Sequence, residues 1–220
     1  MKSNKNLFII FTVLFVLLSL ASPDRFLTLR NIRTMAYQLP EFGLITLGMM
    51  IVILTGGINL SITFASALSG IMAAYALVNF DFNVWLVILA AILIATLVSL
   101  LTGVLNGIIV AYIGVTPILV TLGTGTLFEG ISLRFTKGGT ISGFSEQFSW
   151  IGSGTILGFP IPILVFIIAA LATYFLLERT PWGKRVFMVG SNPEAANFSG
   201  INVKKILMQV YIYSSLMAGL

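Results

Sequence analysis

Polar side chains are scarce in the apolar segments of this sequence, and those present are mostly amides and hydroxyls. Among them are Thr55, Asn59, Ser61, Asn106, Thr121, Thr124 and Glu129. Such groups can exchange hydrogen bonds with a neutral, polyhydroxylated solute, so these seven residues are our candidates for a substrate pathway. The serine and threonine hydroxyls are equally suited to bridging neighbouring helices.

Glu129 is the one carboxylate among these residues. A carboxylate in mid-span costs roughly 2.5–3.5 kcal/mol on insertion scales, so we expect Glu129 to face the bundle interior or to lie near a span end. The nearby Arg134 favours a position close to the water interface.

The inventory of side chains excludes several chemistries. The chain has no Cys and no His, so it cannot form a disulfide framework, a thiolate nucleophile, a hydrolytic triad or the usual zinc sites. No segment matches the phosphate loop G-x-x-x-x-G-K-[ST]. We therefore predict that this chain is not an enzyme and holds no cofactor or metal, and that any ATP and Mg²⁺ are bound by partner subunits.

The composition places most of the chain in a lipid bilayer. Hydrophobic residues make up 58% of the sequence and charged residues 9%, whereas globular proteins are about 25% charged. No charged residue occurs between Asp81 and Glu129. In a membrane chain, basic residues mostly set orientation, so the net charge of +5 does not indicate a nucleic-acid partner.

The hydrophobic pattern predicts an all-α, polytopic membrane protein, with residues 1–220 in a single domain and about six to seven hydrophobic segments. These are residues 7–21, 42–54, 62–78, 84–101 or slightly beyond, 118–133, 161–177 and a stretch that begins at 206. Residues 7–21 form the first span, although the small residues at 19 and 21 also fit a cleaved signal peptide. The last stretch reaches Leu220 without a polar tail, so we expect a chain truncated at its C-terminus, with at least one further span.

Some of these segments are predicted to be discontinuous. Residues 42–54 are too short to cross a bilayer alone, and they run into the polar, glycine-containing stretch 55–61. A near-repeat, Leu44–Gly48 and Leu119–Gly123, points to a second broken segment near residues 121–130, although chance similarity explains it equally well. Broken helix ends are tolerated in membranes where they line a cavity. Residues 24–38 are predicted to form an interfacial amphipathic stretch.

The loop of residues 178–205 carries five cations, which places it in the cytoplasm and, counting spans backwards, places the N-terminus there too. Within it, Asn192 or Ser191 can cap a helix that begins at Pro193, and Gly200 can close that helix in a left-handed conformation. One or two turns are unstable alone, so this helix must dock on something. The alternative is an ordinary interfacial loop helix.

The sequence Glu194-Ala195-Ala196-x-x-x-Gly200 resembles the EAA loop of permease subunits of bacterial ATP-binding-cassette (ABC) importers. The stronger resemblance is to the branch that imports ribose, xylose and other simple sugars, including autoinducers. Matching segments extend from about residue 38 to the end: 54–61, 106–107, 121–124, 179–185, 190–192 and 199–202. Two departures are the absence of a downstream I-x-L-P and the presence of Asn59 where this branch commonly has Asp.

The resemblance implies a permease in the bacterial inner membrane that translocates a simple sugar. Its partners would be a second permease subunit, identical or different, two cytoplasmic ATPases and an external solute-binding protein. The ATPases would dock on the loop at Pro193, Glu194, Ala195, Ala196 and Gly200. The family protein is longer than this chain. The alternative function is a secondary transporter or channel with broken helices, in which Glu129 is the coupling acid.

Overall fold

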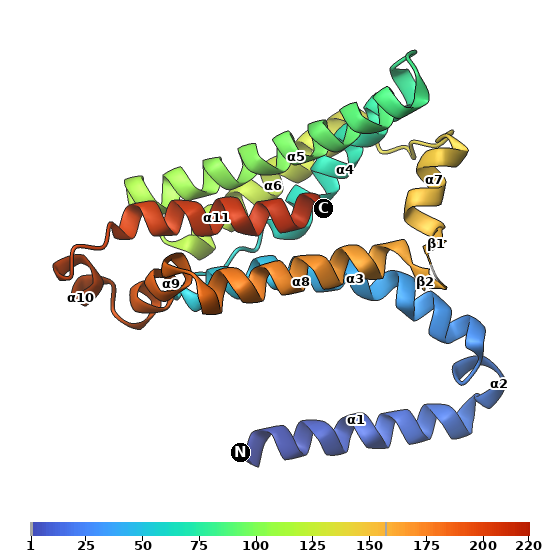
Figure 1. Ribbon diagram of the computed structural model, residues 1–220, viewed down its shortest axis with the longest axis horizontal. Coiled ribbons are helices and arrows are strands. Elements are labelled where there is room, and N and C mark those ends of the chain that lie inside the picture. The colour runs from blue at the N-terminus through green and yellow to red at the C-terminus, as the bar shows by residue number, and fades with distance from the viewer. Residues whose placement is uncertain (1, 157) are drawn as a thin grey trace.

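The computed structural model describes residues 2–156 and 158–220, which are almost entirely helical (Figure 1). The elements are α1 (Lys2–Ala21), α2 (Pro23–Phe26), α3 (Leu29–Leu54), α4 (Ile62–Asn79), α5 (Val84–Ile108), the π-helical turn η1 (Ile109–Ile113), α6 (Pro117–Thr136), α7 (Glu146–Ser153), β1 (Thr155–Ile156), β2 (Phe159–Pro160), α8 (Ile161–Arg179), α9 (Pro181–Ser191), α10 (Pro193–Phe198) and α11 (Val203–Gly219). The two short strands pair antiparallel as a hairpin.

Within the described residues, five helices are long and apolar enough to cross a membrane: α3, α4, α5 continued by η1, α6 and α8. The apolar part of α1, Lys5–Ala21, is shorter, and α11 has 17 residues. The prediction of an all-α, polytopic membrane protein is therefore confirmed. The predicted span at 84–101 is longer than expected, because helix continues through η1 until Gly114 adopts a φ of 85°.

The prediction that residues 42–54 are too short to cross alone is wrong. Their helix, α3, begins at Leu29 and has 26 residues, or about 39 Å at 1.5 Å per residue. The Thr28 hydroxyl caps its start by accepting a hydrogen bond from the Asn31 amide at 3.2 Å. Pro40 lies inside the helix and is buried, and the helix continues through it. Much of the predicted interfacial stretch 24–38 thus belongs to a spanning helix.

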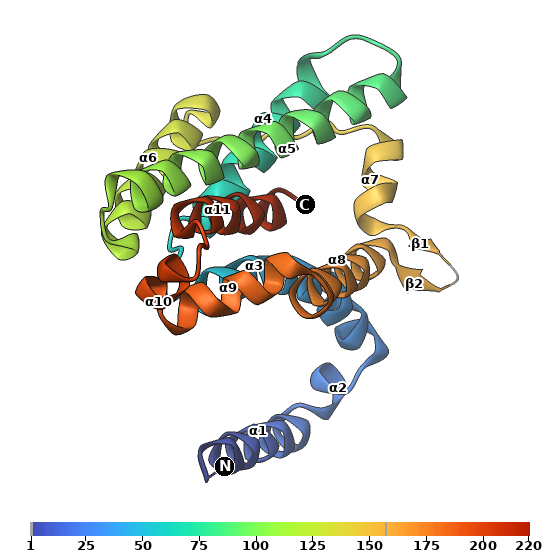
Figure 2. The same cartoon turned by 60° about the vertical axis from the view of Figure 1, so that its left-hand side comes forward.

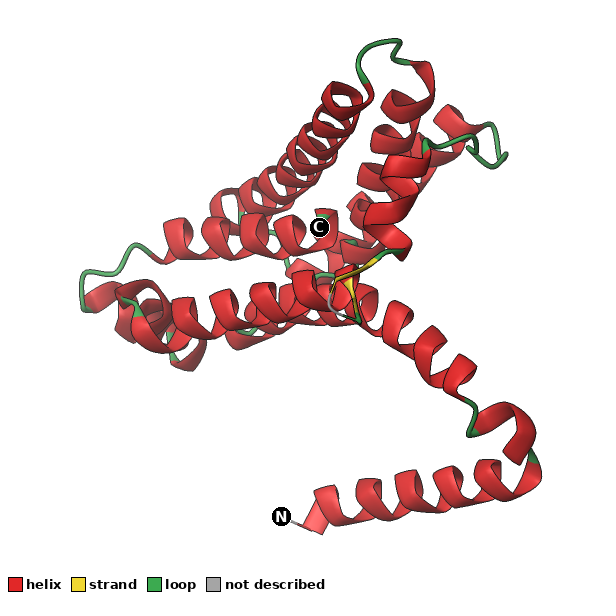
Figure 3. Ribbon diagram, turned by 45° about the vertical axis from the view of Figure 1, so that its right-hand side comes forward, coloured by secondary structure: helices red, strands yellow, loops and turns green. Residues whose placement is uncertain are grey.

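The helices form two layers with α11 between them. In Figures 1 and 2, α4, α5 and α6 lie on one side of α11, and α3 and α8 lie on the other. The loop 55–61, η1, α9 and α10 gather at one end of the bundle, whereas α2, α7 and the hairpin lie at the opposite end. Helix α1 lies apart from the bundle and joins it through α2 (Figure 3).

Glycines allow α11 to approach its neighbours closely. A Cβ atom at Gly48 of α3 would lie 2.7 Å from the Ser214 carbonyl oxygen, and one at Gly103 of α5 would lie 2.8 Å from the Tyr211 carbonyl oxygen. Both distances are shorter than van der Waals contact. A larger side chain at either glycine would push α11 out of its place between the layers.

The predicted break at residues 55–61 is confirmed, and the predicted break near residues 121–130 is wrong. After α3 ends at Leu54, Gly56 adopts a φ of 78° and the chain turns back into α4. By contrast, α6 is continuous from Pro117 to Thr136. Its glycines do not interrupt it, because a glycine keeps its backbone hydrogen bonds and lipid offers no water to replace them.

Candidate substrate pathway and coupling loop

Four of the predicted pathway residues are joined in one chain of side-chain hydrogen bonds. The Thr124 hydroxyl donates to Asn106 Oδ1 at 2.6 Å, and Asn106 Nδ2 donates to Ser61 Oγ at 2.8 Å. Ser61 Oγ in turn donates to Asn59 Oδ1 at 2.7 Å, and Asn59 Nδ2 donates to Ser214 Oγ at 3.0 Å. We call these five residues the polar cluster. It links the loop after α3 to α5, α6 and α11.

The polar cluster is buried inside the bundle, in the half nearer α10. Asn59, Ser61, Asn106 and Ser214 are all 0% exposed. Asn106 lies two residues before the end of α5, and Thr124 lies at the start of the third turn of α6. Buried amides are costly unless they are hydrogen-bonded, and here each carboxamide uses both its donor and its acceptor within the cluster. In this conformation the cluster holds helices together.

The other three predicted pathway residues do not join the cluster. The Thr55 hydroxyl donates to the Val52 carbonyl at 2.8 Å, and the Thr121 hydroxyl donates to the Pro117 carbonyl at 2.8 Å, so both are satisfied by their own helices. Both residues are nevertheless buried. Glu129 is exposed on α6, two turns before its end. That these residues bind solute stays a prediction.

Ser214 was missed in the sequence analysis, although it completes the polar cluster. It lies in the last apolar stretch, where the sequence Tyr211-Ile-Tyr-Ser214-Ser215 interrupts a run of hydrophobic residues. The criterion that selected Asn59 and Asn106, a polar side chain within an apolar segment, applies equally to Ser214. The missing signal was its partner, because sequence alone does not show which span lies beside the break.

The loop helix α10 has the caps that the sequence predicts. Asn192 Oδ1 accepts a hydrogen bond from the Ala195 amide at 3.0 Å, and Pro193 is the first helical residue. At the other end, Gly200 has a φ of 80°, and the Ile201 amide donates to the Ala196 carbonyl at 3.0 Å. Glu194 lies in the first turn, where a negative charge is favoured by the helix dipole.

The two faces of α10 have different surroundings. Ala196 is 2% exposed and packs in a hydrophobic cluster with residues of α3, α9 and α11. Phe198 is 91% exposed, more than any other large hydrophobic side chain described. Beside it, a surface depression is lined by Pro193, Asn197 and Lys204, among others. The inner face of this helix thus packs on the bundle, and its outer face presents a large apolar side chain. Docking of an ATPase on the helix stays a prediction.

Comparison with known proteins now identifies the family. Residues 31–220 match the family model described as the permease component of a branched-chain amino acid transport system. The chain belongs to this family. The match covers most of the permease, including the break after α3, the polar cluster and α10.

Curated relatives of the permease include sugar permeases. It is 36% identical to the ribose import permease protein of Bacillus subtilis over 94% of its own length and 63% of the relative's. It is 34% identical to the D-allose transport system permease protein of Escherichia coli strain K12, over 97% of its length and 64% of the relative's. The L-arabinose ABC transporter permease protein of Azospirillum brasilense is 32% identical over 96% and 60%, respectively.

These similarities confirm the predicted resemblance to sugar-importer permeases. The permease spans just under two thirds of the length of the first two of these relatives. No solved structure shows a significant match to it. The relatives are transport permeases by name, and not enzymes.

Proposed function

We propose that this chain is a permease subunit of an ABC importer that translocates a simple sugar or a similar polyhydroxylated solute. The family and the names of the sugar-permease relatives support this proposal. ATP and Mg²⁺ would be bound by separate ATPase subunits, since the sequence contains no phosphate loop.

The observation that carries the proposal is the two-sided character of α10. Its inner face is fixed to the bundle through Ala196, so a force on the helix reaches the membrane helices. Its outer face presents Phe198, and exposed aromatic side chains that fill a partner's pocket are frequent centres of binding energy. A helix anchored inside and apolar outside suits the docking of an ATPase.

The remaining partners and the orientation follow from the same proposal. A second permease subunit, identical or different, would complete the pathway, and an external binding protein would deliver the solute. The α10 end of the bundle would face the cytoplasm, in agreement with its cations Lys184, Arg185, Lys204 and Lys205. The N-terminus would then be cytoplasmic and the protein would lie in the inner membrane. Residues 1–220 would be part of a single permease domain.

The polar cluster would be the part of the pathway that opens during transport. In the present conformation its amides bind each other, so the solute cannot reach them. If α4 and α5 separate from α6 and α11, the same amides and hydroxyls become available to sugar hydroxyls at little cost, because one set of hydrogen bonds replaces another. Thr55, Thr121 and Glu129 would line the path on either side.

The test is co-purification of the ATPase with the permease from its native membrane in mild detergent. Phe198→Ala is the informative variant, because the side chain supports nothing within its own chain. Loss of an interface hot spot costs about 2 kcal/mol, so affinity should fall roughly 30-fold. Phe82→Ala is the matched control, since Phe82 is 72% exposed in the loop between α4 and α5, which lies at the opposite end of the bundle from α10 (Figure 1). An ATPase retained equally by both variants, with normal uptake, would overturn the docking role of α10.

A further inference from the structure

Both helices that flank α10 contact the first part of the break after α3, residues 55–58, which precedes Asn59 of the polar cluster. Helix α9, which precedes α10, meets the end of α3 through Gly190. Helix α11, which follows α10, meets the break through Tyr211. The three helices are consecutive in the sequence, whereas the break ends 120 residues before α9 begins.

The contact at Gly190 is a backbone-to-backbone approach. A Cβ atom at this position would collide with the Leu54 carbonyl oxygen and would lie 3.2 Å from Thr55 Cα. Residue 190 has no positive φ, so glycine is required here by space and not by backbone conformation. Because backbone atoms cannot rotate away as a flexible side chain can, α9 cannot move toward the end of α3 without displacing it.

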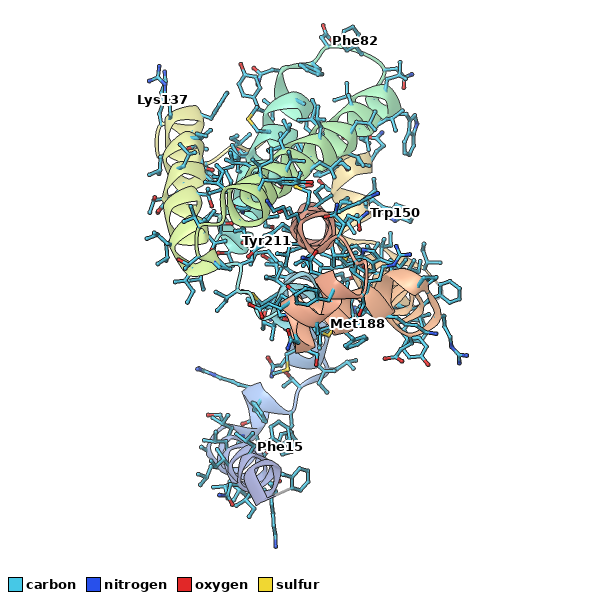
Figure 4. All side chains as sticks on the ribbon, turned by 90° about the vertical axis from the view of Figure 1, so that its left-hand side faces the viewer. Phe15, Phe82, Lys137, Trp150, Met188 and Tyr211 are labelled. Atoms are coloured by element: carbon cyan, nitrogen blue, oxygen red, sulfur yellow. The ribbon has the colours of Figure 1, made fainter. Side chains whose placement is uncertain are left out.

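The contact at Tyr211 reaches the middle of the break. The Tyr211 side chain is 1% exposed and points into the bundle (Figure 4). Its hydroxyl donates a long hydrogen bond of 3.5 Å to the Ile58 carbonyl. A Cβ atom at Gly57 would lie 3.2 Å from the same hydroxyl oxygen. The break is therefore held at Thr55 from one side and at Ile58 from the other.

The residue after Ile58 is Asn59, which is the centre of the polar cluster. Asn59 binds Ser61 and Ser214 through its side chain. A displacement of the break by a fraction of a hydrogen-bond length would lengthen these bonds, because hydrogen bonds weaken steeply with distance and angle. The cluster is thus one residue away from the point that Tyr211 contacts.

The side chains around these contacts are buried and closely packed. Val186 and Val189 of α9, Ala196 of α10 and Tyr211 of α11 lie in the same hydrophobic cluster as Ile51 and Val52 of α3. Four of these side chains, Ile51, Val52, Val186 and Val189, are 0% exposed. Close-packed interiors transmit displacement instead of absorbing it.

We infer that Gly190 and Tyr211 form a joint that passes the movement of α10 to the break at residues 55–58 and so opens or closes the polar cluster. The inference rests on the proposed docking of an ATPase on α10. Gly190 and Tyr211 are positioning residues, because neither needs to touch the solute or the ATPase. Their substitution should separate ATPase binding from the response of the cluster.

The experiment uses a reporter cysteine, which is straightforward because the chain has no native Cys. Leu60→Cys places a half-buried thiol between Asn59 and Ser61. The maleimide reactivity of this thiol is measured in the complex with its ATPase, with and without a non-hydrolysable ATP analogue. We expect the analogue to change the reactivity in the otherwise native chain, and an unchanged reactivity there would overturn the inference.

Gly190→Ala is expected to retain the ATPase. The change in maleimide reactivity that the ATP analogue causes should be about tenfold smaller in this variant. Gly123→Ala is the matched control, because no described atom lies within 4 Å of a Cβ there, and it should respond normally. If Gly190→Ala does not fold, Tyr211→Phe decides, since it removes a single oxygen atom; its response should fall by about threefold. The inference would be overturned if the variant that folds shows the native change in maleimide reactivity, or if it loses the ATPase. Absence of the ATPase from the unsubstituted complex would instead contradict the proposed function.

Discussion

Asn59 donates a hydrogen bond to Ser214 at 3.0 Å, across 155 positions of sequence, and both side chains are fully buried. This bond ties the break after α3 to α11. On its other side the same carboxamide accepts a hydrogen bond from Ser61 at 2.7 Å. The Asn59 carboxamide thus donates one hydrogen bond and accepts another. Both of its partners, Ser61 and Ser214, are hydroxyls, which can either donate or accept.

This arrangement predicts different outcomes for two substitutions of Asn59. In Asn59→Asp, both Ser61 and Ser214 can donate to the carboxylate, so charge-assisted hydrogen bonds offset part of its burial. In Asn59→Leu, the Ser214 hydroxyl loses its donor and the Ser61 hydroxyl loses its acceptor, although Ser61 still accepts from Asn106. We expect Asn59→Asp to retain folding and uptake, whereas Asn59→Leu loses stability by about 1–3 kcal/mol. Thermal unfolding in detergent checks this, and equal stability of the two variants would contradict it.

Asn106 joins α5 to both the break and α6, so its truncation should weaken the whole bundle. Asn106→Ala removes the donor to Ser61 and the acceptor of Thr124 and leaves a small void. The expected cost is about 1–3 kcal/mol, read as a lower unfolding midpoint. The matched control is Asn79→Ala, because Asn79 is exposed and bonds its own helix at Tyr75. The free energy of unfolding of Asn79→Ala should stay within about 0.5 kcal/mol of the native value.

The Asn192 cap predicts a graded effect on ATPase docking. Asn192→Ala removes the acceptor for the Ala195 amide, which destabilises the start of α10 by about 1 kcal/mol and should weaken ATPase retention about fivefold. Asn192→Asp keeps an acceptor oxygen in the same place and should behave as the native chain. The measurement is the amount of ATPase retained at increasing dilution. Equal loss in the two variants would show that the side chain acts in another way.

Some features of the fold and site could be predicted because their cause is local. The turn at Thr55–Ser61 follows from adjacent glycines, and the start of α10 follows from Asn192 and Pro193, which act on their own backbone. The start of α3 could not be placed, since Pro40 normally marks a helix end and its tolerance here depends on the surrounding helices.

The membership of the polar cluster depends on three-dimensional contacts. Composition selected Asn59 and Asn106 as unusual residues, but it did not show that they share Ser61 between them or that Ser214 completes the chain. Thr55 and Thr121 have the same composition signal, yet they bond their own helices. The packing of α5 against α6, and of α11 against the break, brings the cluster members together.

Substitution of Glu129 distinguishes ATP-driven import from proton-coupled transport. It is exposed on α6 and stands outside the polar cluster, so the account gives it no essential proton to carry. Glu129→Gln keeps the shape of the side chain and removes only its charge and its ability to titrate. We expect this variant to keep uptake within about threefold of the native rate, whereas a coupling acid would lose nearly all of it.

The most direct test of the central claim is uptake of labelled ribose, allose and arabinose by cells in which an uncoupler removes the proton gradient while ATP is held constant. If ATP drives import, uptake of at least one sugar continues, Phe198→Ala abolishes this uptake, and Phe82→Ala does not. Collapse of uptake with the uncoupler, together with its loss in Glu129→Gln, would contradict the account and establish a proton-coupled transporter.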